Sequence, residues 1–292
     1  MGFGRVITAM VTPLNDQLEI NWSMVEDLIE YLIVEQKSDG LVISGTTGES
    51  PTLTDDEKLR LFKTAVRVSA GRAKIIAGTG SFDTAHSIHL TKEAEKLGVD
   101  GALLVAPYYN RPTQEGLYRH FKAIATNTSL PVVLYNVPKR TGSNITAETT
   151  IRLAKECANI VGTKEAHDNI EQITAIIKHT PENFRLYSGD DELTLPILAI
   201  GGYGVISVVS HIAGPEIHQM VDAFIEGNVQ QAAYHHGELM PLFKGMFIYP
   251  NPVPIKYALT LQGKQVGGVR LPLVDLNDQE QADIRAVLNR EA

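Results

Sequence analysis

Hydrophobic positions follow two alternating patterns from residue 5 to residue 226. Short apolar runs, most of them rich in β-branched residues, alternate with longer stretches in which apolar residues recur every third or fourth position. The short runs are typical of parallel strands buried on both faces, and the longer stretches of amphipathic helices. The expected strands lie at residues 5–12, 40–44, 74–77, 101–106, 132–135, 160–164, 184–187 and 204–208. The first expected helix follows Asn21, and the others cover residues 55–68, 83–97, 114–127, 146–157, 169–179, 192–200 and 215–226.

Eight such units predict an α/β fold of the (β/α)8 type, the TIM barrel, in which helices enclose a ring of parallel strands. Asn21 is a favourable N-cap residue, and Thr54 with Glu57 forms the pattern of a capping box. A doubly wound open sheet is the alternative, but it normally has fewer units and a glycine-rich phosphate-binding turn after its first strand. Here the first strand ends in Thr12-Pro13, which favours the barrel.

Residues 230–292 show no strand pattern. Helical periodicity continues there at residues 231–243, 254–261 and 278–289. We therefore expect a catalytic (β/α)8 barrel in residues 1–229 and a C-terminal helical region in residues 230–292. Because no linker-like stretch separates them, we expect the helical region to pack on the barrel as an appendix.

Composition and charge limit the partners of this chain. Its 292 residues are 43% hydrophobic and carry a formal net charge of -8 without any basic run, which argues against nucleic-acid binding. No apolar stretch approaches the length of a membrane span, and the first residues have no signal-peptide core. We therefore expect a cytoplasmic protein without membrane contact. The single cysteine, Cys157, cannot form an internal disulfide and is expected to be buried.

The expected strand at residues 160–164 ends in a lysine. Because side chains alternate along a strand, Lys164 is expected to share a face with Ile160 and Gly162, opposite Val161 and Thr163. If that face is the barrel interior, Gly162 leaves open space below the ammonium group. Loss of solvation then favours the neutral amine, which is the nucleophile that forms a Schiff base with a carbonyl carbon. The alternative is a lysine that extends into solvent and pairs with Glu165.

Other polar residues follow neighbouring strands at the same end of the barrel, where the active sites of such folds lie. The loop at residues 45–50 combines two glycines with hydroxyl side chains and can offer N–H groups to a small carboxylate. Residues 107–112 contain paired tyrosines, which alone would indicate an interface. Tyr135 ends the fifth strand and Arg140 follows it; alone, Tyr135 could be a half-buried core aromatic and Arg140 a solvated loop cation. Together with Lys164 they form a constellation for carbonyl chemistry on a substrate with carboxylates.

No metal site is expected. His86 and His89 lie three apart on a helix, and His235 and His236 are adjacent, but no carboxylates converge with either pair.

Four of these segments, at residues 40–49, 107–112, 135–142 and 162–166, resemble the motifs of the dihydrodipicolinate synthase and N-acetylneuraminate lyase family. The resemblance extends over nearly the whole chain, including residues 251–256 and 269–273 of the tail. It implies that Lys164 forms a Schiff base with the ketone of pyruvate. The resulting enamine would then attack the aldehyde of L-aspartate 4-semialdehyde, with no cofactor beyond this covalent intermediate.

The resemblance also implies roles for the surrounding residues. Tyr135 would donate and accept the proton at the imine, and Thr46 would link it to Tyr109, which reaches in from a neighbouring subunit. The chain would therefore form a dimer, and two dimers a homotetramer. The remaining residues would bind substrate: Thr47 with the loop N–H groups at the pyruvate carboxylate, Gly189 and Ile206 on the far side, and Arg140 at the carboxylate of aspartate semialdehyde.

Two other functions remain open at this point. Lyases of keto-sugar acids belong to the same family but generally lack an arginine at position 140. A barrel that binds pyruvate or an amine as a sensor would not need both a nucleophile and a proton relay.

The resemblance bears on regulation as well. Lysine-inhibited members carry an asparagine and a glutamate where this chain has Phe82 and His86, and histidines where it has Asp55 and Lys58; only Ser50 and Tyr108 fit. Because a cation repels an amine effector, we predict weak or absent inhibition by lysine.

Overall fold

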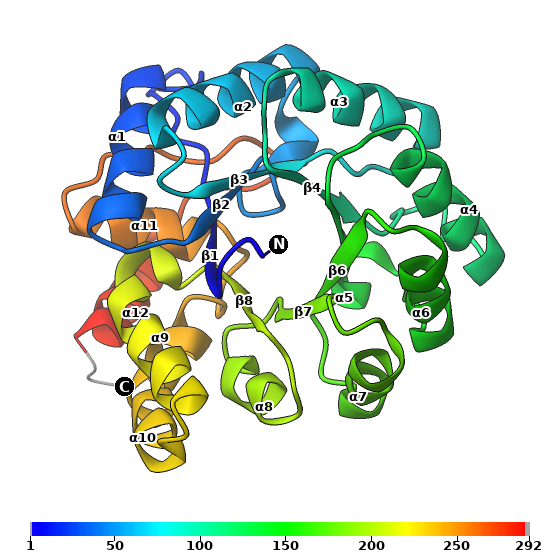
Figure 1. Ribbon diagram of the computed structural model, residues 1–292. Coiled ribbons are helices and arrows are strands. Elements are labelled where there is room, and N and C mark those ends of the chain that lie inside the picture. The colour runs from blue at the N-terminus through cyan, green and yellow to red at the C-terminus, as the bar shows by residue number, and fades with distance from the viewer. Residues whose placement is uncertain (1, 290–292) are drawn as a thin grey trace.

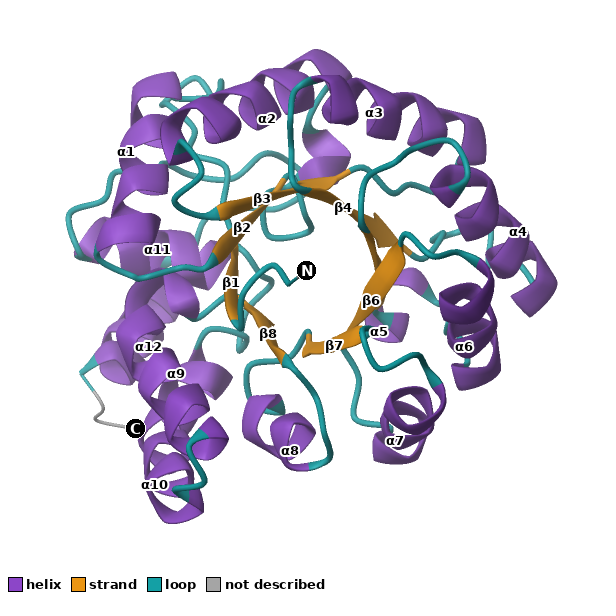
Figure 2. Ribbon diagram, in the orientation of Figure 1, coloured by secondary structure: helices purple, strands orange, loops and turns teal. Residues whose placement is uncertain are grey.

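The computed structural model describes residues 2–289, and within them eight parallel strands close into a barrel. Each strand pairs with the next, and β8 returns to β1. Figure 2 shows the strands as a ring enclosed by helices. The strands are β1 (Val6–Ala9), β2 (Gly40–Ile43), β3 (Lys74–Gly78), β4 (Gly101–Val105), β5 (Val132–Asn136), β6 (Ile160–Glu165), β7 (Arg185–Ser188) and β8 (Gly204–Ser207). The predicted (β/α)8 fold is confirmed.

Helices follow the strands around the ring (Figure 1). They are α1 (Trp22–Val34), α2 (Asp55–Ser69), α3 (Thr84–Lys96), α4 (Gln114–Ala125), α5 (Pro138–Thr141), α6 (Ala147–Glu156), α7 (Ile170–His179), α8 (Thr194–Ala199) and α9 (Ser210–Ile225). The Asn21 side chain caps α1, and Thr54 and Glu57 form the predicted capping box at α2. The short helix α5 and a 3-10 turn at Ser50–Thr52 were not predicted.

Two boundaries differ from the prediction for identifiable reasons. β1 ends at Ala9 rather than at residue 12, because the Val11 N–H donates to the His211 ring instead of to a neighbouring strand. α9 begins at Ser210 rather than at Pro215. The non-helical backbone of Ala213 turns the chain within this segment, and the proline then lies just after the kink, where its missing N–H costs little.

The alternation predicted for β6 is wrong at its start. Val132 pairs with Ile160, but the next residue of β5, Val133, pairs with Gly162, so Val161 is the extra residue of a bulge. Ile160 consequently packs between the sheet and the helices, while Val161 lies against the barrel interior. Gly162 also leaves no open space, because a Cβ there would collide with the carbonyl oxygen of Arg185. The glycine instead permits the close approach of β7.

The barrel interior is closed at its amino end and open at its carboxyl end. Phe3 belongs to the interior cluster and lies where a Cβ on Gly101, the first residue of β4, would strike its ring. Figure 1 accordingly shows the dark blue segment that precedes β1 within the ring of strands. A larger cluster fills the space between the strands and the helices, and includes Cys157, which is buried as predicted.

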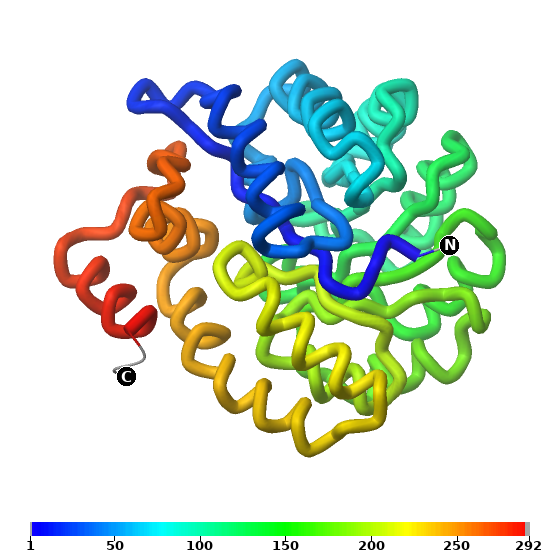
Figure 3. The backbone as a smooth tube through the Cα atoms, turned by 60° about the vertical axis from the view of Figure 1, so that its left-hand side comes forward, coloured from blue at the N-terminus to red at the C-terminus, as the bar shows by residue number. Residues whose placement is uncertain are grey.

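The last three helices pack against the barrel helices. They are α10 (Val229–Gly245), α11 (Val253–Leu261) and α12 (Asp278–Leu288). α10 lies along α9, and α12 contacts both α10 and α11. In Figure 3 the orange part of the tail lies beside the blue N-terminal segments, where the Leu14 N–H donates to the Val266 carbonyl. Arg270 in the tail forms an ion pair with Glu57 of α2 at 2.6 Å.

Candidate functional site

A cavity of about 230 Å³ opens at the carboxyl ends of β2 to β5. It contains three of the predicted site residues, Thr46, Tyr135 and Arg140. The full lining consists of Ser44, Gly45, Thr46, Ser50, Pro51, Gly78, Gly80, Leu103, Val105, Tyr108, Tyr135, Val137, Arg140 and Thr141.

Lys164 lies beside this cavity with only 5% of its surface exposed. The sheet register pairs it with Tyr135 across β5 and β6, and its Nζ lies 4.5 Å from the centre of the Tyr135 ring. A surface ion pair with Glu165, the alternative considered from the sequence, is wrong, since Glu165 faces the other side of β6 and binds different partners. The lysine amine is therefore held at the end of the barrel next to a phenol.

Gly189 lies against the stem of this lysine, and Ile206 lies in the barrel interior. A Cβ on Gly189 would lie 2.9 Å from Lys164 Cε, so only glycine lets the lysine stem pass. Ile206 is 1% exposed and belongs to the same interior cluster as Tyr135. Neither residue lines the cavity itself.

The chain brings Thr46 and Tyr135 together but leaves Tyr109 outside. Thr46 and Tyr135 line one cavity, although no hydrogen bond joins them within residues 2–289. Tyr109 is 94% exposed, and its left-handed backbone (φ 70°) lies in the loop after β4. Its side chain extends from the surface rather than into the cavity of its own chain.

The loop after β2 has the form of a carboxylate-binding turn. Ser44 and Glu49 both have left-handed backbones (φ 57°), and no backbone carbonyl in the described chain accepts the N–H of Thr46 or Thr47. A Cβ on Gly48 would lie 3.0 Å from the Met10 carbonyl oxygen, so the loop packs closely on the segment after β1. Two unpaired N–H groups in one turn can donate to a carboxylate.

Arg140 lies on α5, directly after β5. Gly142 ends this helix in the left-handed conformation, and the Arg111 Nε donates to the Gly142 carbonyl at 3.1 Å. Within residues 2–289 the Arg140 side chain has no carboxylate partner. Its guanidinium is thus free to bind a substrate carboxylate.

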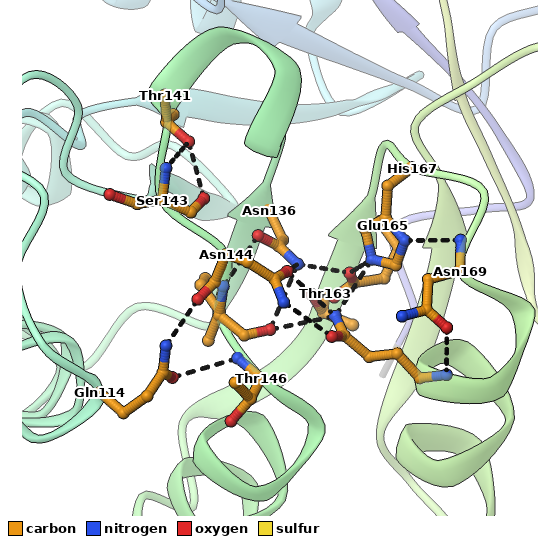
Figure 4. A network of polar contacts seen from close by, with 12 residues as sticks. Gln114, Asn136, Thr141, Ser143, Asn144, Thr146, Thr163, Glu165, His167 and Asn169 are labelled. Carbon is orange, nitrogen blue, oxygen red and sulfur yellow. Dashed lines mark hydrogen bonds and ion pairs between the residues drawn. The ribbon is translucent and has the colours of Figure 1, made fainter.

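A polar network behind the site was not predicted from the sequence (Figure 4). Glu165 is fully buried and accepts hydrogen bonds from Thr163 Oγ1 at 2.6 Å, Asn136 Nδ2 at 2.9 Å and His167 Nε2 at 2.6 Å. His167 Nδ1 accepts the N–H of Asn169 at 3.1 Å, which places the ring proton on Nε2, the atom facing Glu165.

This network fixes the ends of β5 and β6. Asn136 follows Tyr135 and Glu165 follows Lys164, so each polar residue points outward directly after a site residue that points inward. The Asn136 amide also donates to Asn144 Oδ1 at 2.9 Å. The alternation of side chains along β5 and β6 is the sequence signal from which this outward-facing network could have been predicted.

The positions that correspond to the effector site of lysine-inhibited relatives are joined to one another by polar contacts. His86 Nε2 lies 2.8 Å from an Asp55 oxygen, and Lys58 Nζ lies 3.8 Å from the same carboxylate. Phe82 packs edge-on against Tyr108 at 5.2 Å between ring centres.

Among residues 2–289, no group of three or more His, Cys, Asp or Glu side chains is arranged to hold a metal ion. In the same residues, no helix combines the length and the apolar content needed to cross a membrane.

The carboxyl end of the barrel thus holds a buried amine beside a phenol, a turn with two unpaired N–H groups and a guanidinium without a carboxylate partner in the described chain. Such an arrangement is typical of a barrel enzyme of carbonyl chemistry. The chain belongs to the dihydrodipicolinate synthetase family, whose sequence profile matches residues 2–291. A 4-hydroxy-tetrahydrodipicolinate synthase from Desulforamulus reducens is 57% identical over 287 residues, which cover 98% of this chain and 97% of the relative.

Solved structures agree with this assignment. A dihydrodipicolinate synthase from Bacillus anthracis has a TM-score of 0.96 and 46% sequence identity, covering 99% of this chain and 98% of that chain. The enzyme from Cyanidioschyzon merolae with lysine bound has a TM-score of 0.96 and 47% identity, covering 98% and 97%.

Proposed function

We propose that this chain is a 4-hydroxy-tetrahydrodipicolinate synthase, a lyase that condenses pyruvate with L-aspartate 4-semialdehyde through a Schiff base on Lys164. The observation that carries the proposal is the buried Lys164 amine 4.5 Å from the Tyr135 ring, in a chain 57% identical to a synthase of that name. The product belongs to the biosynthesis of diaminopimelate and lysine.

The reaction begins when the Lys164 amine attacks the ketone carbon of pyruvate and the ketone oxygen leaves as water. The positive imine nitrogen then withdraws electrons, so that the methyl group loses a proton and the enamine forms. The enamine carbon attacks the aldehyde of the second substrate. The amino group of that substrate finally displaces Lys164 from the imine carbon, which closes the ring and frees the enzyme.

Tyr135 serves these steps as proton donor and acceptor. Its ring lies beside the lysine, so its hydroxyl can lose a proton to the departing water and regain one from a substrate. Thr46 lines the same cavity and would connect Tyr135 to a Tyr109 supplied by a second subunit. No cofactor enters this scheme.

The two substrate carboxylates have separate partners. The free N–H groups of Thr46 and Thr47, with the Thr47 hydroxyl, would hold the carboxylate of pyruvate. Arg140, without a carboxylate partner of its own, would bind the carboxylate of aspartate semialdehyde in a bidentate manner. This cation favours the synthase over a lyase of polyhydroxylated keto-sugar acids.

The exposed Tyr109 supports an active site completed by a second copy of the chain. A tyrosine 94% exposed on a strained loop next to the cavity is well placed to reach a neighbouring subunit. The assembly we propose is a homotetramer, built as a dimer of dimers, in the cytoplasm.

The proposal is tested by a coupled assay with pyruvate and aspartate semialdehyde on the wild type and on Lys164→Arg, which keeps the charge but lacks the amine nucleophile. Turnover in the wild type that is lost in the variant supports the synthase. Cleavage of a keto-sugar acid without condensation would instead identify a lyase of the same family.

A further inference from the structure

Asn251 connects the C-terminal helices to the turn expected to bind pyruvate. It lies just before α11 and is 6% exposed, and its Nδ2 donates a hydrogen bond to Thr47 Oγ1 at 3.0 Å. The two residues are far apart in sequence but both buried. No role in the chemistry described so far falls to Asn251.

The same turn is fixed to the tail at a second point. Lys256 of α11 donates to Glu49 Oε1 at 2.9 Å, to the Thr12 carbonyl at 2.9 Å and to the Gly268 carbonyl, and both charged side chains are 3% exposed. The other Glu49 oxygen accepts the Arg270 N–H at 2.9 Å. The tail therefore fixes the backbone of the turn independently of Asn251.

Within residues 2–289, the Asn251 side chain forms no hydrogen bond other than the one to Thr47. Its second polar atom, Oδ1, is buried without a hydrogen-bond partner in the described chain. A residue needed only to hold the tail in place would have both polar atoms paired. Its amide is thus directed at one hydroxyl.

We propose that Asn251 is a positioning residue for pyruvate binding, because its donated hydrogen bond orients the Thr47 hydroxyl. Thr47 Oγ1 uses a lone pair to accept the Asn251 proton, so its own proton remains available to donate. No group within residues 2–289 accepts that proton, so it can be donated to a substrate carboxylate. The inference rests on the proposed function, since it assigns the pyruvate carboxylate to Thr47.

The test compares Asn251→Ala, Asn251→Asp and Thr47→Val in steady-state kinetics. Asn251→Ala should raise the KM for pyruvate roughly fivefold, with kcat and the KM for aspartate semialdehyde within about twofold. Asn251→Asp should raise the pyruvate KM more, roughly tenfold or above, because an aspartate accepts the Thr47 proton and repels the carboxylate. A purely structural role predicts the reverse order, since Asp preserves the shape of Asn and Ala leaves a void.

A double variant tests whether Asn251 acts through Thr47. In a Thr47→Val background, Asn251→Ala should add less than about twofold to the pyruvate KM, because the hydroxyl it orients is gone. Tyr249→Phe is the matched control. It removes a hydrogen bond to Asp283 within the tail, and within residues 2–289 the Tyr249 hydroxyl forms no hydrogen bond with the turn, so its pyruvate KM should equal that of the wild type.

Borohydride trapping of the wild type with pyruvate distinguishes failure of the proposed function from failure of the positioning role of Asn251. Absence of a trapped adduct in the wild type would refute the proposed function itself. A trapped adduct together with an unchanged pyruvate KM in Asn251→Ala, a milder effect of Asp than of Ala, or full additivity with Thr47→Val would each overturn the positioning role alone.

Discussion

The buried ion pair between Lys256 and Glu49 gives the most quantitative prediction about how the tail supports the site. Lys256→Met removes the ammonium group but retains an unbranched side chain of similar length. Among the described residues, Glu49 would then keep only the Arg270 N–H as a donor while remaining about as buried as before. Removing one member of a buried pair typically costs about 3–5 kcal/mol, because the remaining charge is uncompensated.

The pKa of Lys256 is consistent with a large desolvation cost. Burial lowers the pKa of this ammonium group, and the attraction of Glu49 opposes that shift only in part. Neutralising both members should therefore be far less damaging than removing one. We expect the double variant Glu49→Gln/Lys256→Met to recover at least half of the stability lost in Lys256→Met.

The assay is urea unfolding followed by circular dichroism at one fixed protein concentration. Lys96→Met serves as the control, since its ion pair with Glu93 lies at the surface (68% and 31% exposed) and should contribute less than about 1 kcal/mol. A Lys256→Met variant as stable as that control, or a double variant no more stable than the single one, would refute the reasoning.

Three further predictions concern pH, specificity and regulation. Burial lowers the pKa of His211 to about 4, so as pH falls this imidazole becomes protonated in the unfolded chain before it does in the folded one. Folding is therefore less favourable at low pH. Between pH 7 and pH 5 the wild type should lose about 2 kcal/mol more unfolding free energy than His211→Gln. Equal losses in urea titrations at the two pH values would contradict this. Arg140→Lys keeps the charge but not the bidentate geometry, so it should raise the KM for aspartate semialdehyde roughly tenfold while pyruvate trapping is unchanged; an unaltered KM would remove Arg140 from the site. Because Asp55 is already paired with His86, lysine should inhibit weakly or not at all, and an inhibition constant in the millimolar range or below would disprove this.

The sequence predicted the barrel because its determinants are local. Each strand and each amphipathic helix repeats a short hydrophobic pattern, and caps such as Asn21 and Thr54 mark helix starts through side-chain to backbone bonds a few residues apart. Residues at the ends of strands or just after them, such as Tyr135 and Arg140, could be assigned to one rim, since parallel strands end at one face.

Features that depend on contacts between residues far apart in the sequence could not be predicted from these local patterns. The bulge opposite Val132 arises from pairing between two strands, and the sequence of β6 alone shows no sign of it. The hydrogen bond from Asn251 to Thr47 joins the C-terminal tail to the loop after β2, and these two residues meet only in the folded chain. The position of Tyr109 relative to a site cannot be checked in a single chain, because this side chain is predicted to reach the site of a neighbouring subunit.

The measurement that tests the account most directly is borohydride reduction of the wild type in the presence of pyruvate, followed by peptide mass spectrometry. We predict that one reduced pyruvate unit is attached to the peptide containing Lys164, and that Lys164→Arg acquires none. Attachment to another lysine, or no attachment in a wild-type enzyme that turns over, would contradict a Schiff base at Lys164.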